Sequence, residues 1–240
     1  MPWWYAVAER DHVIQNPTSE AKIRLLGTLL RLTPQTTVLD VGCGKAGPAV
    51  LLAHEFGCRI TGIERAAEFA AAARDRVEAA GIADRVEIVQ RDASELALEP
   101  ERYEVTMCLG ASFIWYGLDR TLGALSPATR PGGRVVVGEP YWRRWPLPAG
   151  IDDEGFVSLA ETAERFERAG LSVIGLIVSN EDDWDRYRSL HWRAVDEWLA
   201  EHPDDPDAPD FRARGERYRE QYFQHERELL GWAIFVARKR

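Results

Sequence analysis

A short apolar run that ends in a glycine-rich turn constrains the fold of this chain more than any other feature. Val38-Leu39-Asp40-Val41 runs directly into Gly42-Cys43-Gly44-Lys45-Ala46-Gly47, which is typical of a strand that passes through a tight loop into a helix. Gly42 and Gly44 allow positive φ and let a ligand approach main-chain N–H groups at the start of that helix. Asp40 places a carboxylate before the loop, where its negative charge attracts a cationic ligand and repels a pyrophosphate. The segment therefore predicts a cofactor site.

Strands alternate with helices along most of the sequence. Apolar runs predict seven strands, at 37–41, 59–63, 85–89, 103–109, 133–138, 171–178 and 232–237. Amphipathic or alanine-rich segments predict helices, at 19–32, 47–56, 66–80, 121–125 and 157–169. This alternation is typical of an α/β fold with a doubly wound, Rossmann-like, mostly parallel sheet. With 240 residues, 45% of them hydrophobic, residues 1–240 are expected to form one domain.

Two further segments add helical structure around this sheet. Residues 1–32 are expected to form an N-terminal edge or lid, and residues 181–230 a helical insertion between the sixth and seventh strands. Large side chains of the insertion recur at near-helical spacing and are expected to pack in a core; they are Trp184, Tyr187, Trp192, Val195, Trp198 and Leu199. The acidic, proline-rich stretch 201–210 interrupts the insertion and predicts an exposed loop.

Two more acids stand at the ends of predicted strands. Glu64 ends the second strand and Asp92 the third. Because the carboxyl ends of parallel strands converge on one crevice, both are expected to lie near Asp40. From the residues alone, each acid can also have a structural role, Asp40 and Asp92 as helix caps and Glu64 as a surface acid.

The Asp-x-Gly-x-Gly segment at 40–44, followed by these two acids, resembles motif I and the later acidic positions of the class I S-adenosylmethionine-dependent methyltransferases. Residues 130–138 resemble the turn into the fifth strand of that family. The resemblance implies S-adenosylmethionine as cofactor and the strand order 3-2-1-4-5-7-6, with strand seven antiparallel. It implies that Glu64 binds the ribose and that Asp92 faces the adenine edge. The cofactor-binding residues expected on this basis are Asp40, Gly42, Gly44, Glu64, Arg65, Asp92, Ala93 and Leu109.

Rarer motifs resemble a narrower bacterial group related to the small-molecule methyltransferases of quinone biosynthesis. They are His12–Pro17, Leu109–Trp115, Gly138–Arg143 and Trp184–Tyr187. This resemblance implies a small-molecule acceptor without identifying it. The glycine loop departs from the fuller family pattern, because Ala46 stands for the third glycine and Lys45 brings a cation close to a positively charged cofactor. Lys45 is therefore expected to point outward.

Methyl transfer from a sulfonium mainly requires that the acceptor, the methyl carbon and the sulfur be aligned. A general base is needed only where the acceptor must lose a proton early. Glu139, after the fifth strand, and His12, on the N-terminal segment, are the candidate catalytic residues, although His12 can equally be a surface histidine. Aromatic residues near strand ends are candidates for stacking on an apolar acceptor or for core packing; they are Trp115, Tyr116, Tyr141 and Trp142.

Composition narrows the function classes. The formal net charge of -9 argues against nucleic-acid or anionic-membrane partners. No apolar run approaches the ~18 residues that span a bilayer, and the first residues lack the features of a signal peptide, so a cytoplasmic protein is expected. The spacing of Cys43, Cys58 and Cys108 predicts neither a disulfide framework nor a metal site. Oligomeric state cannot be predicted.

Two alternative functions follow from the same motif. Gly42-x-Gly44-x-x-Gly47 also satisfies the dinucleotide fingerprint, which indicates an NAD-dependent oxidoreductase in which Glu64 binds the ribose. Asp40 and Asp92 argue against that function. The other alternative is a non-catalytic protein that binds S-adenosylmethionine.

Overall fold

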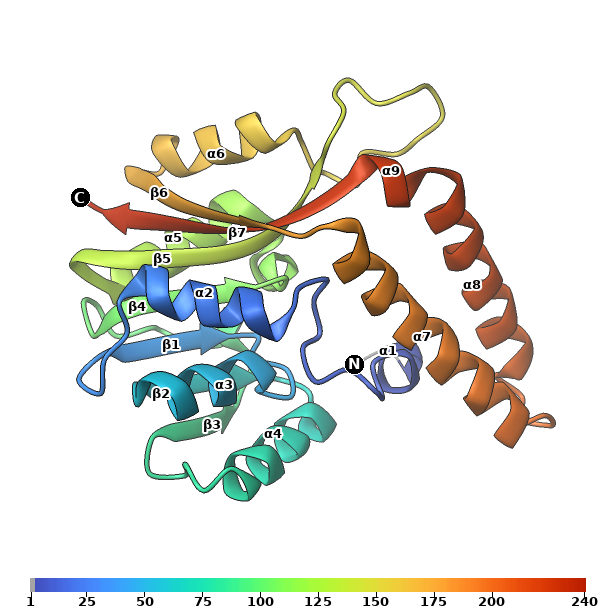
Figure 1. Cartoon of the computed structure of the whole chain (residues 1–240), viewed down its shortest axis with the longest axis horizontal. Helices are drawn as coiled ribbons and strands as arrows, with labels where there is room; N and C mark the ends of the chain where they lie inside the picture. Colours follow the sequence, from blue (N-terminus) through green and yellow to red (C-terminus); the bar gives the residue numbers. More distant parts are fainter. Residues whose placement is uncertain (1–2) are drawn as a thin grey trace.

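A seven-stranded sheet forms the centre of the computed structural model, which describes residues 3–240 (Figure 1). The strand order is β3-β2-β1-β4-β5-β7-β6, as the family resemblance implies. The strands are β1 (Thr37–Val41), β2 (Arg59–Glu64), β3 (Val86–Gln90), β4 (Tyr103–Leu109), β5 (Thr129–Trp142), β6 (Leu171–Val178) and β7 (Leu230–Lys239). The predicted doubly wound α/β fold is confirmed.

The direction of the strands changes at one side of the sheet. β3, β2, β1, β4 and β5 pair in parallel, whereas β7 runs antiparallel between β5 and β6. β5 and β7 are longer than expected, because Tyr141 pairs with Gly231 and Trp142 with Leu230 beyond the predicted strand ends. β1 lies between β2 and β4, so the strand order reverses beside it. Ligand crevices of open α/β sheets lie at such a reversal, outside the carboxyl ends of the strands.

Helices cover both faces of the sheet. α2 (Glu20–Leu30), α3 (Gly47–Phe56) and α4 (Ala67–Ala79) pack on one face, where Ile23, Leu52 and Ala73 share a core with Val38 of β1. α5 (Leu118–Ala128) and α6 (Leu159–Arg168) pack on the other, where Leu122 and Phe166 share a second core with Leu39. Adjacent residues of a strand point to opposite faces, which explains why Val38 and Leu39 belong to different cores.

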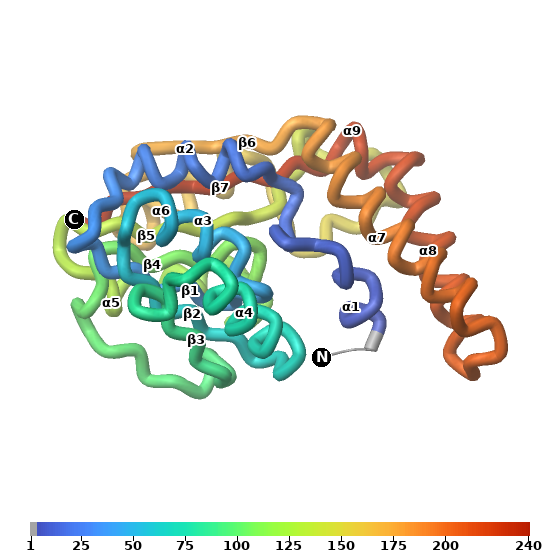
Figure 2. Tube along the Cα trace, turned by 60° about the horizontal axis from the view of Figure 1, so that its bottom comes forward, coloured from blue at the N-terminus to red at the C-terminus, as the bar shows by residue number. Residues whose placement is uncertain are grey.

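The insertion between β6 and β7 forms a helical arm that extends away from the sheet, as Figures 1 and 2 both show. It comprises α7 (Glu181–Glu201), α8 (Ala208–Gln221), a π-helical turn, η3 (Tyr222–Glu226), and α9 (Arg227–Leu229). The predicted exposed loop is shorter than expected, because residues 208–210 form the first turn of α8, where a proline is well tolerated.

The N-terminal segment packs against this arm. α1 (Trp3–Ala8) lies beside α7, and Trp4 and Val7 share a small core with Trp198 and Phe211. The aromatic stripe predicted to pack does so, since Trp184, Val195 and Trp198 are buried. Residues 1 and 2 of the expected lid segment lie outside the described residues. Between residues 3 and 240, no helix combines the length and apolar character needed to cross a bilayer.

Candidate functional site

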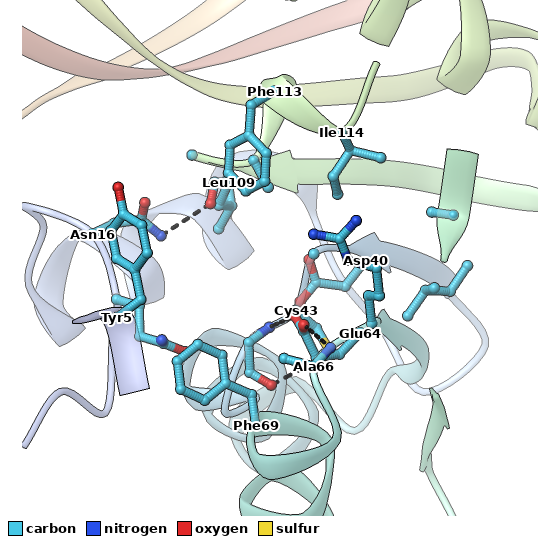
Figure 3. Close-up of a pocket in the computed structure, with 18 of the residues that line it drawn as sticks. Tyr5, Asn16, Asp40, Cys43, Glu64, Ala66, Phe69, Leu109, Phe113 and Ile114 are labelled. Carbon is cyan, nitrogen blue, oxygen red and sulfur yellow. Dashed lines mark hydrogen bonds between the residues drawn. The ribbon is translucent and has the colours of Figure 1, made fainter. Parts of the chain in front are cut away.

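A cavity of about 750 Å³ opens at the carboxyl ends of β1, β2 and β4, within the roughly 300–1,000 Å³ that small-molecule sites occupy. Most of its wall comes from four parts of the chain: the β1 and β2 ends with the glycine loop, the N-terminal segment, the stretch after β3, and the stretch after β4. In Figure 3, Tyr5 and Asn16 face Asp40 and Glu64 across the open space. Other lining residues include Phe69, Arg91, Ser94, Gly110, Ala111, Phe113, Ile114 and Tyr187.

The glycine loop is held tightly between the N-terminal segment and the stretch after β4. Gly42 and Gly44 have φ of 70° and 54°, in the left-handed region that favours glycine. A Cβ on Gly44 would lie 2.1 Å from Gln15 Oε1, and one on Gly42 would lie 2.5 Å from the Cβ of Ala111. Since the main-chain N–H of Lys45 donates to Gln15 Oε1 over 2.8 Å, a side chain at position 44 would disrupt this contact.

Asp40 presents a buried carboxylate to the cavity. Only 2% of the residue is exposed, yet it belongs to the cavity wall. Burial, reinforced by the negative charge of Glu64, raises the pKa of the Asp40 carboxyl to about 7. A cationic ligand would favour the ionised form, so the site suits a positively charged group.

Glu64 braces the same loop. Its Oε2 accepts a hydrogen bond from the Gly44 N–H over 3.0 Å, and its Oε1 accepts one from the Ala66 N–H over 2.7 Å. The side chain therefore connects the glycine loop to the start of α4 and also lines the cavity (Figure 3). A carboxylate has about four lone-pair sites, so these two bonds leave capacity for a ligand hydroxyl.

Asp92 combines a capping role with a place in the cavity wall. Its Oδ1 accepts from the main-chain N–H of Ser94 over 3.0 Å, which caps the short 3₁₀ helix η1 (Ala93–Glu95). Its Oδ2 pairs with Arg65 Nη1 over 3.1 Å. The hydrogen bonds from Ser94, followed by Arg65, hold the pKa of Asp92 below its usual value. Arg65, Asp92 and Ala93 all line the cavity.

Comparisons with known proteins give this geometry a family. Residues 38–133 match a family model described as a methyltransferase domain. The protein is 31% identical to the uncharacterized protein YjhP of Escherichia coli K12, in an alignment that covers 98% of this chain and 98% of that protein. A SAM-dependent methyltransferase from Geobacter sulfurreducens, crystallised with S-adenosyl-L-homocysteine, matches with a TM-score of 0.94 and 34% identity, covering 100% of this chain and 99% of that one. The chain belongs to the class I S-adenosylmethionine-dependent methyltransferases.

This membership confirms the enzyme class and the cofactor implied by the sequence resemblance. The protein is a methyltransferase that uses S-adenosylmethionine, and the comparisons give no support to an NAD-dependent oxidoreductase or a non-catalytic protein. A relative with a named activity is 27-O-demethylrifamycin SV methyltransferase of Amycolatopsis mediterranei, 26% identical over 96% of this chain and 87% of that protein. The narrower resemblance to quinone-biosynthesis enzymes stays a prediction.

The two candidate catalytic residues of this methyltransferase are not among the cavity-lining residues found in the described chain. Glu139 is 6% exposed and accepts a hydrogen bond from Ser112 Oγ over 3.1 Å. It lies on the face of β5 that Val135 and Val137 also occupy, toward α5 and α6. Burial, opposed by the Ser112 bond, raises the pKa of Glu139 to about 7. The placement of Glu139 as a candidate catalytic residue is corrected: its carboxyl contacts Ser112 and does not line the cavity.

His12 is neither a surface histidine nor part of the cavity wall. It is 1% exposed, with its ring centroid 4.9 Å from that of Tyr187 and 4.4 Å from that of His191. Its Nε2 lies 3.0 Å from the carbonyl oxygen of Tyr187. Burial lowers the pKa of His12 to about 4. The N-terminal segment contributes other residues, such as Tyr5 and Asn16, to the cavity wall, whereas His12 points into the contact of the segment with α7. The lid hypothesis for this segment stays a prediction.

Three of the four candidate aromatics pack in or against the core, which is the second of the two alternatives that the sequence left open. Tyr141 and Trp142 are 5% and 3% exposed, because both continue β5 in its pairing with β7. Trp142 Nε1 donates to the Asp153 carbonyl oxygen over 3.0 Å. Trp115 packs against the core beneath α5. Tyr116, which is 86% exposed, does line the cavity.

Lys45 corrects another expectation. Its ammonium points away from solvent, toward the N-terminal segment, and donates to the carbonyl oxygens of Glu9 over 2.6 Å and Arg10 over 2.8 Å. Nζ also lies 5.5 Å from the centroid of the Phe69 ring. The carbonyl oxygens and the aromatic face stabilise the ammonium and hold it toward the N-terminal segment. Lys45 thus holds the N-terminal segment against the glycine loop.

Several wall residues were missed by sequence reasoning. Tyr5, Glu9, Val13, Gln15 and Asn16 come from the N-terminal segment, and the Asn16 side-chain amide donates to the Leu109 carbonyl oxygen over 3.1 Å. The motif at residues 12–17 signalled this part of the chain without assigning any residue a role. Four further wall residues were missed. Phe113 and Ile114 lie on the 3₁₀ helix η2 (Ser112–Trp115), which follows β4, Phe69 lies on α4, and Tyr187 lies on α7.

Proposed function

We propose that this methyltransferase transfers the methyl group of S-adenosylmethionine to a small apolar molecule bound in the cavity beside the glycine loop. The observation that carries the proposal is the buried carboxylate of Asp40, which opens onto the cavity next to Gly42 and Glu64. S-adenosylmethionine has cationic groups, an ammonium and a sulfonium, that favour such a carboxylate in its ionised form.

The proposed cofactor-binding residues divide by the part of the ligand they contact. Gly42 and Gly44 allow the ligand to approach the main chain, with Asp40 facing its amino-acid portion. Glu64 binds the ribose hydroxyls with the carboxylate lone pairs that the Gly44 and Ala66 bonds leave free. Arg65 lies beside it and can only donate hydrogen bonds. Asp92 and Ala93 contact the adenine edge. Leu109 forms the part of the wall at the end of β4. All of these line one cavity.

The residues act mainly by orientation. When bound, S-adenosylmethionine supplies an electrophilic methyl group on a sulfonium sulfur. Holding the acceptor atom in line with that carbon can contribute up to roughly 7–11 kcal/mol. The N-terminal segment and the stretch after β4 supply the facing wall, through Tyr5 and Phe113 (Figure 3). The same segments exclude water from the reacting atoms.

Aromatic side chains at the mouth favour a hydrophobic or aromatic acceptor. Phe113, Tyr116 and Tyr5 are 69%, 86% and 45% exposed while lining the cavity. Large aromatic faces left open at a concave site are typical of surfaces that bind apolar ligands. The relative that acts on 27-O-demethylrifamycin SV supports this proposal, because that acceptor is also a small molecule.

We place the protein in the cytoplasm. The three cysteines, Cys43, Cys58 and Cys108, are free and buried, which fits a reducing compartment. The net charge of -9 supports a small-molecule acceptor over a nucleic acid.

A panel of hydrophobic metabolites bearing hydroxyl, amine, carboxylate or thiol groups, assayed for S-adenosylhomocysteine formation, tests the proposal. We expect at least one acceptor to give turnover. Tyr116→Ala should then raise the KM for that acceptor and leave the KM for S-adenosylmethionine unchanged. Phe223→Ala, which removes an aromatic that is 64% exposed on the helical arm, is the matched control and should change neither. Equal effects of the two substitutions would refute an acceptor site at this mouth.

A further inference from the structure

A buried cluster joins the N-terminal segment to the helical arm. Glu9 and His12 come from the segment and His191 from α7, and their potential ligand atoms all lie within 4.8 Å of one another. Glu9 and His12 are 5% and 1% exposed. His191 Nε2 lies 2.8 Å from Glu9 Oε1, which also accepts a hydrogen bond from the Tyr187 hydroxyl over 3.1 Å. Side chains far apart in sequence thus converge on one buried point.

Two polar atoms in this cluster face each other without a hydrogen-bond partner among the described residues. They are Nδ1 of His12 and Oε2 of Glu9, which lie 3.5 Å apart. The Nε2 of His12 lies 3.0 Å from the Tyr187 carbonyl oxygen, and a carbonyl can only accept, so Nε2 carries the proton. The lone pair of Nδ1 then points at a carboxylate oxygen. Unpaired polar atoms at this depth are costly and require an explanation.

We propose that Glu9, His12 and His191 bind a divalent transition-metal ion such as Zn²⁺. Two imidazoles and one carboxylate are ligands that such ions prefer. The separation of 3.5 Å between Glu9 Oε2 and His12 Nδ1 matches the edge of a tetrahedron with metal–ligand bonds of about 2.1 Å. An ion at this point would give both unpaired atoms a partner. This inference does not rest on the proposed function.

The surroundings fit a metal site in two respects. His12 Nε2 donates to the Tyr187 carbonyl oxygen. A bond of this kind is common behind metal-bound histidines, because it keeps the proton on one ring nitrogen and leaves the other, here Nδ1, free to bind the ion. Glu9 and Tyr187 also line the cavity, so an ion can enter from there and a water can occupy a fourth position.

The ion would fasten the N-terminal segment to α7 beside the cofactor loop. Lys45 already bonds the carbonyl oxygens of Glu9 and Arg10 to that loop. Segment, arm and loop would then be connected through Glu9. A hydrogen-bonded network without an ion accounts for the contacts of Glu9 Oε1 but leaves His12 Nδ1 and Glu9 Oε2 unpaired.

Metal titration of the chelator-treated full chain tests the site directly. Zn²⁺ binding is measured by calorimetry, and Co²⁺ binding by visible absorption, which reports coordination geometry. We expect one ion per chain, with nitrogen and oxygen ligands. Glu9→Gln keeps the side-chain shape and can still hydrogen-bond to His191, while His191→Gln removes the ligand with the greatest exposure, at 14% of its side chain. Each variant should bind at least about tenfold more weakly.

His54→Gln is the matched control, because His54 is exposed on α3; it should bind as the wild type does. Circular dichroism checks that all variants are folded. Absence of stoichiometric binding by the wild-type protein would overturn the proposal, and so would wild-type affinity in both Glu9→Gln and His191→Gln. The readout is metal binding itself, so the result is independent of whether an acceptor for methyl transfer is found.

Discussion

Asp40 imposes a free-energy cost on the unliganded protein at a residue that we propose binds the cofactor. Burial and the nearby charge of Glu64 raise the pKa of its carboxyl to about 7, so ionising it in the empty site is unfavourable. A bound cation removes that cost. If Asp40 binds the cofactor as we propose, stability is lower at position 40 in exchange for ligand affinity, as is common at functional sites.

The substitution Asp40→Asn should reveal this cost as a pH-dependent gain in stability. The native pKa lies above the ordinary value of 3.8, so the wild type loses stability as pH rises from about 4 to about 7, whereas the variant does not. A shift of about three pH units corresponds to roughly 4 kcal/mol, as an order of magnitude. In urea unfolding without ligand, the free energy of unfolding of the variant relative to the wild type should increase by roughly 1–4 kcal/mol between pH 4 and pH 8. A constant difference across that range would contradict the assignment.

Glu139 should prove a supporting residue, because its carboxylate contacts Ser112 and does not line the cavity. Glu139→Gln keeps the shape and can still accept the Ser112 bond. We expect kcat to stay within about threefold of the wild type, since a general base contributes roughly 10²–10⁴-fold. The pH profile of kcat should also be unchanged near pH 7. A hundredfold loss with a missing acidic limb would restore Glu139 as a catalytic base.

Residues whose role depends on local sequence were predictable, and those whose role depends on orientation were not. Gly42, Gly44 and Asp40 follow from one strand-turn segment, and all three line the cavity. Tyr141 and Trp142 were misplaced because the continuation of β5 depends on pairing with β7, about 90 residues away along the chain. Sequence proximity to a strand end does not determine which face a side chain occupies.

At the level of elements, the N-terminal segment is the part that completes the site. It contributes wall residues from Tyr5 to Asn16, although its helix α1 has only 6 residues. So short a helix is not stable alone in water and depends on its contacts with α7 and the glycine loop. The contact with the loop is made by the Lys45 ammonium, with Glu9 and Arg10.

Lys45→Met should loosen this segment without unfolding the sheet. Methionine keeps the length of the side chain but cannot donate to the two carbonyl oxygens. Hydrogen bonds from charged donors are worth roughly 1.5–3 kcal/mol, so we expect the amides of residues 9–16 to exchange at least about tenfold faster. Lys239→Met is the control, because Lys239 bonds the Thr129 carbonyl oxygen over 2.7 Å, at the far end of the sheet. Unchanged exchange in Lys45→Met, measured by mass spectrometry, would show that Lys45 does not hold the segment.

Strands of the sheet were easier to predict than the segments that cover the site. β1, β4 and β6 match their predicted bounds, because each is an apolar run bounded by turn residues. α1 and η2 were not predicted as helices. Both are short, and their conformations depend on contacts with distant parts of the chain, such as the bond from Asn16 to the Leu109 carbonyl. The lid hypothesis placed residues 1–32 near the site but named no contact, because nothing in the local sequence indicates that Asn16 bonds to Leu109.

Across the whole molecule, one edge of the sheet collects the functional groups. The strand order reverses beside β1, which brings the ends of β1, β2 and β4 to one crevice. The N-terminal segment, with residues such as Tyr5 and Asn16, and the arm between β6 and β7, through Tyr187, contribute further parts of the wall. Topology and cofactor class were implied by the family resemblance that the glycine loop and the strand-end acids carry, whereas we propose that the acceptor is determined by side chains of these covering segments.

Calorimetric titration with S-adenosylhomocysteine tests most directly whether this edge binds the cofactor. Asp84→Asn is the matched control for Asp40→Asn, because Asp84 is exposed at the opposite end of the sheet. We predict one molecule bound per chain by the wild type and by Asp84→Asn, and affinity at least about tenfold lower for Asp40→Asn, a loss of roughly 1.4 kcal/mol or more. Equal affinity in all three proteins, or no binding by the wild type, would contradict the account.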